Sequence, residues 1–471
     1  MLRRLILFCI LICAAAAMAD EAAPVPMQVR YSATPETVRV VLDLPKAVTY
    51  TDQSTPKQVQ VALPLPLAKA LEPVTIDDPL VTLATVTPDA EGNAVLRITL
   101  AKARRVRICT LEAAEDKPFR LVVDVLKRYT KEERRALSPA VSYIHLERQT
   151  DDGYLAAHFV TVDTSKPGVH FSAVPAQGCR ERASEMVART GAVCGVNGGY
   201  FLGNIFAHPV GLLKAEDKIL SMPLWERTAA AFPTTGVPTI LNPRGTWRFT
   251  LPDGTTREFP DSLDATAQTP APVSVIVNGY TFAQAPGNAN GLTLLLYDGH
   301  VLGRAHTAFP LAPGEYALQL TRDDAQTLGA QLLDETAITL EPVITPDLAG
   351  FPSAVGAGPR LLRDGQIALT GEKERFQPDI LLGRNARTAL GLTADKCVIL
   401  AAIEAPGPYG GGATLAELAQ LLKDRGATDA MNFDGGGSTQ LAIGPTTVTV
   451  PPGTWVRPVA SGVLVFDGGA K

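Results

Sequence analysis

The sequence predicts a two-domain protein in which a small all-β domain precedes a larger α+β domain built on a mixed sheet. Three observations predict this fold class. Residues 27–128 hold short apolar or alternating runs of strand length, separated by turn residues. A charged stretch without an apolar face follows at 129–140. Beyond it, helix-like and strand-like runs mix, and 471 residues with 46% hydrophobic and only 19% charged side chains suffice for two folded domains.

The first 19 residues have the pattern of a secretory signal. Arg3 and Arg4 precede an apolar run at 5–13, and small residues follow as far as Ala19. This pattern predicts a signal peptide at 1–19 that is cleaved before Asp20. An uncleaved membrane anchor is the alternative, although the apolar run is short for a span of about 20 residues. No later segment is apolar enough for a transmembrane anchor, so we expect export to the periplasm or cell envelope.

The net charge and the cysteines bear on nucleic-acid binding, disulfide formation and metal binding. Cleavage removes Arg3 and Arg4 and so moves the formal net charge from −5 to −7, which argues against nucleic acid as a partner. Cys179 and Cys194 flank a helix-like stretch and could form a disulfide in an oxidising compartment, or remain isolated thiols. No zinc-ligand spacing or calcium-binding repeat is present, and the sequence predicts no metal and no cofactor.

The first domain is predicted at 25–128 from four strand-like runs, at 38–44, 58–63, 94–100 and 119–125. The run Arg-Val-Val-Leu-Asp-Leu at 39–44 and the run Phe-Arg-Leu-Val-Val-Asp-Val at 119–125 resemble the opening and closing strands of the AMIN domain of bacterial envelope proteins. The resemblance implies contact with peptidoglycan or other cell-wall material. A β-domain with a structural role is the alternative.

The second domain is predicted at 141–471, after a linker or short connecting helix at 129–140. Expected strands include 154–162 and 397–403, and a helix is expected at 181–189. A second helix begins at Thr414, where Glu417 completes a capping box ahead of an apolar face of leucines. The glycine-rich loop at 407–412 leads into this helix, whose N-terminus favours an anion.

Two glycine-rich turns carry the candidate chemistry. One is Gly-Val-Asn-Gly-Gly-Tyr-Phe at 195–201, and the other is Asn-Phe-Asp-Gly-Gly-Gly-Ser-Thr at 432–439. Glycines lack the Cβ atoms that keep a ligand away from backbone N–H groups, so such turns can bind anions or sugars. For the second turn a β-hairpin is the alternative, because Asp-Gly is a strong hairpin signal.

These turns belong to an ordered set of motifs. Asn-Gly-Gly-Tyr-Phe at 197–201, Gly-Pro-Arg-Leu-Leu-Arg-Asp-Gly at 358–365, Arg-Thr-Ala-Leu-Gly at 387–391, the helix start at 414–418, the second glycine turn and Arg457 occur in that order. In this order the chain resembles the phosphodiester glycosidase family, whose animal member removes N-acetylglucosamine from a phosphodiester. The resemblance covers about 141–469.

The resemblance implies a hydrolase that cleaves the glycosidic bond of a sugar-1-phosphodiester, here an exported one acting on cell-envelope or exopolysaccharide material. A non-catalytic cell-wall or polysaccharide-binding protein is the alternative. Carried over by motif, the resemblance predicts one substrate-binding pocket lined by Asn197, Gly198, Gly199, Phe201, Arg387, Thr388, Gly435, Gly436, Gly437 and Ser438.

The chemistry suggests a role for each charged group. Arg387 could meet the phosphate charge with its planar fork, or could form a structural ion pair. Asp434 is the predicted catalytic carboxylate, and Glu404 is the predicted second one, with a solvated strand-end acid as the alternative. Relatives commonly carry Asp-Gly-Arg where this chain has Glu-Ala-Pro at 404–406. His208 is a candidate acid or phosphate donor, or an incidental loop histidine.

Overall fold

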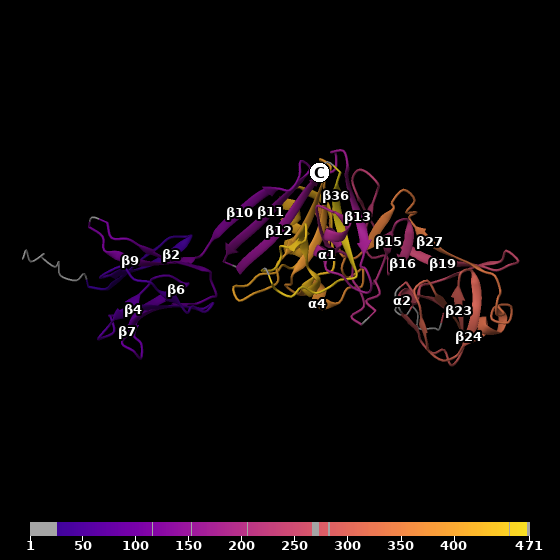
Figure 1. The fold of residues 1–471 in the computed structure, drawn as a ribbon, viewed down its shortest axis with the longest axis horizontal. Helices are drawn as coiled ribbons and strands as arrows, with labels where there is room; N and C mark the ends of the chain where they lie inside the picture. Colours follow the sequence, from indigo (N-terminus) through magenta and orange to yellow (C-terminus); the bar gives the residue numbers. More distant parts are fainter. Residues whose placement is uncertain are drawn as a thin grey trace, which may run out of the picture. The chain divides into compact units, whose positions relative to one another are not determined.

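The computed structural model describes residues 26–468, apart from residues 115, 152, 205, 266–272, 281–282 and 452. The predicted signal peptide and its cleavage site lie outside these residues. The chain divides into two compact units between Lys127 and Arg128 (Figure 1). No helix in the described ranges combines the length and the apolar character needed to cross a membrane.

The first unit consists of two antiparallel sheets with a common core. The strand order is β1-β2-β9-β8 in one sheet and β3-β4-β7-β6-β5 in the other. The bounds are β1 Gln28–Ala33, β2 Thr37–Leu44, β3 Thr51–Asp52, β4 Gln58–Pro66, β5 Val74–Thr75, β6 Val81–Pro88, β7 Asn93–Leu100, β8 Val106–Leu111 and β9 Phe119–Leu126. The four strands predicted from the sequence are therefore confirmed as β2, β4, β7 and β9.

Alternation along β2 shows why these residues form a sandwich. Val38, Val40 and Leu42 are fully buried in the core, while Arg39 between them reaches the outer face. There its guanidinium donates to both carboxylate oxygens of Asp124 on β9, at 2.7 and 2.8 Å. Such cross-strand pairs help to set the register of the sheet. The resemblance of this unit to the AMIN domain stays a prediction.

The second unit is organised around an eight-stranded sheet with the order β10-β11-β12-β32-β31-β33-β29-β30. Figure 1 shows β10, β11 and β12 side by side at one edge of it. The bounds are β10 Tyr129–Ala136, β11 Val141–Thr150, β12 Gly153–Asp163, β29 Arg360–Arg363, β30 Gln366–Ile367, β31 Arg387–Thr393, β32 Cys397–Ile403 and β33 Ala427–Asn432.

Two five-stranded sheets pack against this central sheet, and the largest core of the unit contains residues of all three. Their orders are β13-β36-β14-β34-β35 and β16-β15-β28-β17-β18. The bounds are β13 Val169–Pro175, β14 Cys194–Asn197, β15 Leu213–Ala215, β16 Lys218–Ser221, β17 Ala229–Phe232, β18 Thr239–Leu241, β28 Ser353–Gly356, β34 Leu441–Ile443, β35 Thr446–Thr447 and β36 Ser461–Asp467.

Helices cover the outer faces of these sheets. The helix α5 (Leu415–Asp424) packs on the central sheet through Leu418 and Leu422, and α1 (Ala183–Thr190) packs through Met186 on the sheet that contains β36. The predicted capping box of α5 is confirmed, since Thr414 and Glu417 bond each other's backbone N–H groups at 3.2 and 2.9 Å. The short helix α4 spans Pro378–Leu382, and a single 3₁₀ turn, η1, spans Gly436–Ser438.

Between β18 and β28 the chain forms an insertion with its own apolar core. It contains three small sheets, of orders β20-β19-β27, β21-β26-β23-β24 and β22-β25. The bounds are β19 Arg244–Thr250, β20 Thr256–Phe259, α2 Ser262–Ala265, β21 Val275–Asn278, β22 Ala283–Ala285, β23 Leu292–Tyr297, β24 His300–Ala305, β25 Phe309–Leu311, β26 Tyr316–Leu320, α3 Arg322–Thr327 and β27 Thr339–Thr345.

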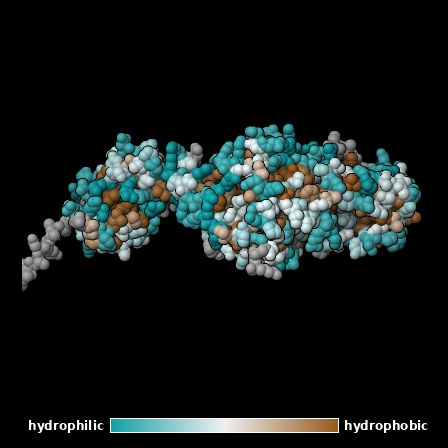
Figure 2. Space-filling model, turned by 90° about the horizontal axis from the view of Figure 1, so that it is seen from above, coloured by the Kyte–Doolittle hydropathy of each residue, from teal (hydrophilic) through white to brown (hydrophobic). Residues whose placement is uncertain are grey.

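The predicted α+β class with a mixed sheet is wrong. Strands account for 49% of the structure and helices for 8%, and every described pairing between the named strands is antiparallel. The physical reason is that the sheets bury their apolar faces against one another, so few helices are needed to cover the remaining faces. Hydrophobic residues on the face shown in Figure 2 occur as patches among hydrophilic ones.

The stretch at 129–140, predicted as a linker or a short helix, instead holds the edge strand β10. Nearly all of its residues are exposed, so its alternating charges do not need an apolar face. Glu132 pairs with Arg134 and with Arg425 beyond α5, at 3.1 Å in the second case. Charged side chains are typical of edge strands, where they discourage pairing with another chain.

The proposed pairing of Cys179 with Cys194 is not present. All four described cysteines are free, and Cys194 is buried in the core while Cys179 lies on the loop before α1. Burial raises the pKa of the Cys194 thiol to about 12. The first glycine turn is therefore supported without a disulfide.

The first unit should fold without the rest of the chain. Its core draws on residues between Val38 and Val125, all within the unit. We expect a fragment of residues 26–127 to unfold cooperatively on heating, with the far-ultraviolet circular dichroism of a β-protein. A fragment without a thermal transition would contradict this expectation.

Candidate functional site

The two glycine turns, more than two hundred residues apart in sequence, meet in the structure. The first follows β14 and the second follows β33. The backbone N–H of Asp434 donates to the carbonyl of Gly198 at 3.2 Å. The two turns are therefore in direct contact, and the substrate pocket expected around them stays a prediction.

Asn197 joins the segments around this contact. Its Oδ1 accepts from the Thr388 hydroxyl at 2.7 Å and from the Gln440 N–H at 3.0 Å. Its Nδ2 donates to the carbonyl of Asp434 at 2.8 Å. Asn197 and Thr388 are both 0% exposed. These two predicted substrate-binding residues thus hold β14, β31 and the second turn together, and their side chains bond protein groups.

Most glycines of the two turns allow chain segments to approach one another. A Cβ atom on Gly198 would lie 2.5 Å from the Ser461 hydroxyl, and one on Gly199 would lie 2.3 Å from the carbonyl of Gly356. A Cβ on Gly435 would lie 2.8 Å from the carbonyl of Ala386. The sequence predicts that these glycines let a ligand approach the backbone, whereas in the structure they allow close packing between chain segments.

Gly436 and Gly437 differ from the other turn glycines because they are exposed. Gly436 has a φ of +56° and faces open space. The guanidinium of exposed Arg457 lies against Gly437, where a Cβ would approach its central carbon to 2.7 Å. This part of the second turn therefore combines accessible backbone with a cation.

Asp434 lies beside this exposed backbone. Burial raises the pKa of its carboxyl to about 6, against opposing effects of the Ser438 hydroxyl, the Gly435 N–H and the charge of Arg457. Desolvation penalises the charged form of an acid, which explains the direction. A carboxyl with this pKa can give or take a proton near neutral pH.

Arg387 is placed differently from its neighbour Thr388, since consecutive residues of β31 point to opposite faces of the sheet. Its Nε donates to the carbonyl of Ala413 at 3.0 Å, and its Nη2 donates to those of Ile380 and Gly383 at 3.0 and 2.5 Å. Within the described ranges no carboxylate lies at ion-pair distance from it. Arg387 is thus a buried cation held by carbonyl groups, and the alternative of an ion pair is not realised.

The remaining predicted residues are Phe201, at the end of the first turn, and His208, shortly after it along the chain. Phe201 carries the guanidinium of Arg180 over its ring at 5.2 Å. His208 is buried, and burial lowers its pKa to about 4. It lines a cavity of about 350 Å³ between residues 202–208 and the insertion, whose walls do not include the second turn. Arg180 has no motif around it, so the sequence offered no signal for it.

The N-terminus of α5 is occupied by a carboxylate of the protein itself, that of Glu417. The Glu417 carboxylate accepts from the Thr414 N–H and also pairs with Arg384. Arg384 in turn donates to the carbonyl of Gly412 at 3.0 Å. The anion site predicted at this helix start is therefore filled by the protein's own carboxylate.

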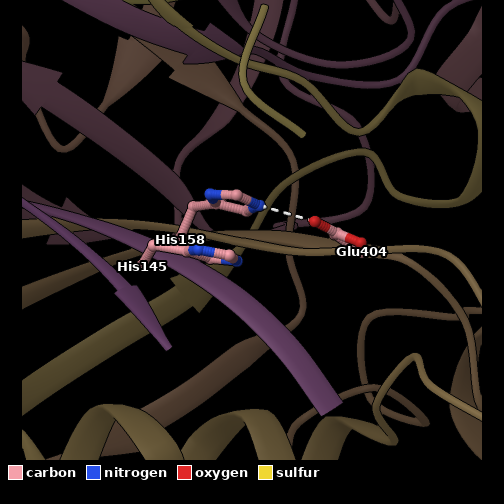
Figure 3. Close-up of side chains that lie close together, drawn as sticks. All are labelled: His145, His158 and Glu404. Atoms are coloured by element: carbon pink, nitrogen blue, oxygen red, sulfur yellow. Dashed lines mark hydrogen bonds and ion pairs between the residues drawn. The ribbon is translucent and has the colours of Figure 1, made fainter. Parts of the chain in front are cut away.

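Glu404 follows β32 and belongs to a second cluster. Its Oε1 lies 2.9 Å from Nε2 of His158, and Nδ1 of His158 lies 2.8 Å from the Tyr143 hydroxyl. The ring of His145 stacks on that of His158 with centroids 4.7 Å apart. Figure 3 shows the two stacked rings with Glu404 beside His158. The alternative of a merely solvated acid does not fit, and both histidines were missed because no motif links them.

The hydrogen bonds of Asn197 should contribute strongly to the free energy of unfolding. Replacement of Asn197 by alanine would leave the Thr388 hydroxyl, the Gln440 N–H and the Asp434 carbonyl without partners, and we expect a loss of about 3 kcal/mol. Urea unfolding measures it. The control Asn385→Ala removes one longer bond to the carbonyl of Asp379 and should cost less than about 1 kcal/mol. Equal losses would contradict the role given to Asn197.

The raised pKa of Asp434 predicts a pH-dependent effect of Asp434→Asn on stability. The folded protein holds this proton more tightly than the unfolded chain, so the native state loses stability as the pH rises from about 4 through 6. The neutral variant avoids that loss. We expect it to be more stable than the parent at pH 8, by the order of 2 kcal/mol, and similar to it at pH 4. Thermal unfolding at both pH values measures this, and a destabilised variant at pH 8 would contradict it.

Comparison with known proteins agrees with the motif order. Residues 271–466 match the model of the phosphodiester glycosidase family. This range contains Arg387, Glu404, Asp434 and Arg457. No curated protein matches the chain.

Solved structures show the same fold at low sequence identity. A hypothetical protein from Synechocystis has a TM-score of 0.63 at 20% identity, over 93% of this chain and 80% of that one. A presumed exported protein from Burkholderia pseudomallei has a TM-score of 0.53 at 18% identity, over 89% of this chain and 96% of that one.

A third structure is the catalytic domain of zebrafish N-acetylglucosamine-1-phosphodiester alpha-N-acetylglucosaminidase, auto-inhibited by its pro-peptide. Its TM-score of 0.36 at 15% identity, over 71% of this chain and 87% of that one, is too low to carry an argument about fold. The family match does not depend on it. The predicted resemblance is confirmed over residues 271–466, which match the model of the phosphodiester glycosidase family.

Proposed function

We propose that the protein is an exported hydrolase that cleaves the glycosidic bond of a sugar-1-phosphodiester from the cell envelope or an exopolysaccharide. The observation that carries the proposal is Asp434, a carboxyl with a pKa of about 6 beside exposed glycines and the guanidinium of Arg457. The match of residues 271–466 to the model of the phosphodiester glycosidase family supports the reaction class.

The charges around the second turn suit a phosphodiester, which carries one negative charge. Arg457 is exposed and offers a planar fork for two phosphate oxygens. The N–H groups of Gly436 and Gly437 lie on the same exposed turn. Arg387 is buried below the turn, where a Cβ on Gly435 would approach its Cα to 3.9 Å, and adds positive charge without touching the ligand. We therefore assign Arg457, rather than Arg387, to direct phosphate contact.

The phosphomonoester is a good leaving group, so its departure needs little assistance from the protein. The bond between the anomeric carbon and the bridging oxygen breaks, and the phosphomonoester leaves with the electron pair. Water adds its oxygen to the anomeric carbon and gives up one proton. Asp434 in its ionised form accepts that proton, and a pKa near 6 keeps it ionised at neutral pH while leaving it basic enough to act. Stabilisation of the oxocarbenium-like centre by the same carboxylate would add to the rate.

The proposal also includes export of the protein and a substrate in the cell envelope. The signal-like pattern at 1–19 supports export. The similarly folded protein from Burkholderia pseudomallei, presumed to be exported, agrees with it. The AMIN-like pattern at 25–128 supports a role for the first unit in holding the enzyme near cell-wall material.

The test is product analysis by mass spectrometry on a panel of sugar-1-phosphodiesters, with the reaction run in ¹⁸O-labelled water. We expect free sugar carrying the label and an unlabelled phosphomonoester, because the C–O bond breaks. Label in the phosphate would mean P–O cleavage and would overturn the glycosidase assignment. Binding without turnover of any panel member would favour the polysaccharide-binding alternative.

Two aspartate variants test the assignment of Asp434. Asp434→Asn should lower kcat by at least about 100-fold with little change in KM, because proton transfer is lost. Asp395→Asn is a matched control, since this exposed residue lies in the turn between β31 and β32, at the opposite end of those strands from Arg387. It should keep the parental rate. Full activity of Asp434→Asn would remove Asp434 from the mechanism.

A further inference from the structure

The cluster of His145, His158 and Glu404 follows from the register of three neighbouring strands. His145 on β11 lies directly opposite His158 on β12, so both side chains share one face of the sheet. The N–H of Glu404, just beyond β32, donates to the carbonyl of Ala156 on β12 at 3.0 Å. Two imidazoles and a carboxylate thus project from adjacent strands to one place (Figure 3).

One polar atom of this cluster is left without a partner. Nε2 of His145 is buried and has no hydrogen bond within the described part of the chain. A buried polar nitrogen in this state costs free energy, and such atoms call for an explanation, such as an ion. The three ligand atoms, one from each residue, lie within 4.8 Å of one another. An ion between them would give His145 Nε2 a partner.

The contacts of His158 fit a metal ligand. Its side chain is 3% exposed, and its Nδ1 lies 2.8 Å from the Tyr143 hydroxyl. With Nε2 turned to a metal, Nδ1 carries the proton and donates it to the Tyr143 oxygen. Metal-binding histidines usually have such a second partner, which fixes the ring and its tautomer.

The surroundings also suit a cation. Glu133 on β10 lies opposite His145 in the register, and Glu147 lies two residues further along β11. Both act electrostatically on His145, together with Glu404. The opposing charges are Arg135, over the ring of Tyr143, and Lys131, which pairs with Glu133 at 2.6 Å. Three carboxylates therefore face two cations around the place where the three ligand atoms converge.

We propose that His145, His158 and Glu404 bind a Zn²⁺ ion. Two imidazole nitrogens and one carboxylate oxygen form a ligand set that Zn²⁺ accepts, with a fourth position left for water. Bonds of about 2.0–2.2 Å require the three atoms to move together and the two stacked rings, which are 8° from parallel, to tilt so that both point a nitrogen at one ion. The Glu404 side chain, 37% exposed, has room to move. The ion takes Glu404 out of the set of free carboxylates, so the predicted role of Glu404 as a second catalytic acid is replaced by that of a ligand.

The proposal is independent of the glycosidase function and is tested by binding alone. The mature full-length protein, stripped of metal with a chelator, is titrated with Zn²⁺ by isothermal calorimetry and by competition with a fluorescent zinc chelator. We expect one ion per chain, with Glu404→Gln and His145→Ala each weakening binding by at least about tenfold. His300→Ala is the matched control, because this exposed histidine lies on β24 of the insertion, and its affinity should equal that of the parent.

The melting temperature with and without Zn²⁺ distinguishes a loss of binding from a loss of folding. Glu404→Gln conserves shape at a partly exposed position, so it should fold. Saturating Zn²⁺ should raise the Tm of the parent and of His300→Ala but not that of Glu404→Gln. Failure of the parent to bind one ion, or equal binding by the parent and Glu404→Gln, would overturn the proposal. The cluster would then be a histidine stack with a His–Glu ion pair.

Discussion

The hydrogen bonds of Asn197 are the constraint on which the site depends. One fully buried side chain on β14 bonds Thr388 on β31 and, in the segment between β33 and β34, both Asp434 and Gln440, so it joins three separate stretches of the chain. Since a buried amide that lost these partners would be costly, the two sheets that contain β14 and β31 are held at one relative position. The glycines around it then permit the close backbone approach that this position demands. The exposed part of the second turn is available for chemistry because the rest is fixed.

Charge is arranged in layers around the second turn. Arg387 is buried among carbonyl groups, Asp434 is largely surrounded by protein, and Arg457 lies at the surface. Desolvation raises the pKa of the Asp434 carboxyl to about 6. Arg387, buried beneath the turn, and Arg457, exposed on it, both favour an anion nearby. This order is the reason for our proposal that Arg387, which sequence motifs mark for phosphate contact, acts through its charge alone, since its guanidinium is bonded to backbone carbonyl groups.

The second cluster shows how an antiparallel sheet can build a polar site without a motif. His145 and His158 are thirteen residues apart and become neighbours only through the pairing of β11 with β12. Glu404 joins them because β32 pairs with the other edge of β12. The carboxylate of Glu404 therefore has a local partner, His158, that no sequence motif indicated.

Local patterns in the sequence determined the four strands of the first unit, the helix α5 with its capping box, and the resemblance of residues 271–466 to the phosphodiester glycosidase family. Alternation, capping residues and motifs are all short-range signals. The tertiary structure alone decided the rest. It set β10 as an edge strand, because exposed charges carry no periodicity that distinguishes a strand from a linker. It also replaced the expected α+β class, because only packing shows that sheets cover one another. Finally, it separated Arg387 from Thr388 and brought His145 to Glu404, because the faces of strands and the register between them depend on partners distant in sequence.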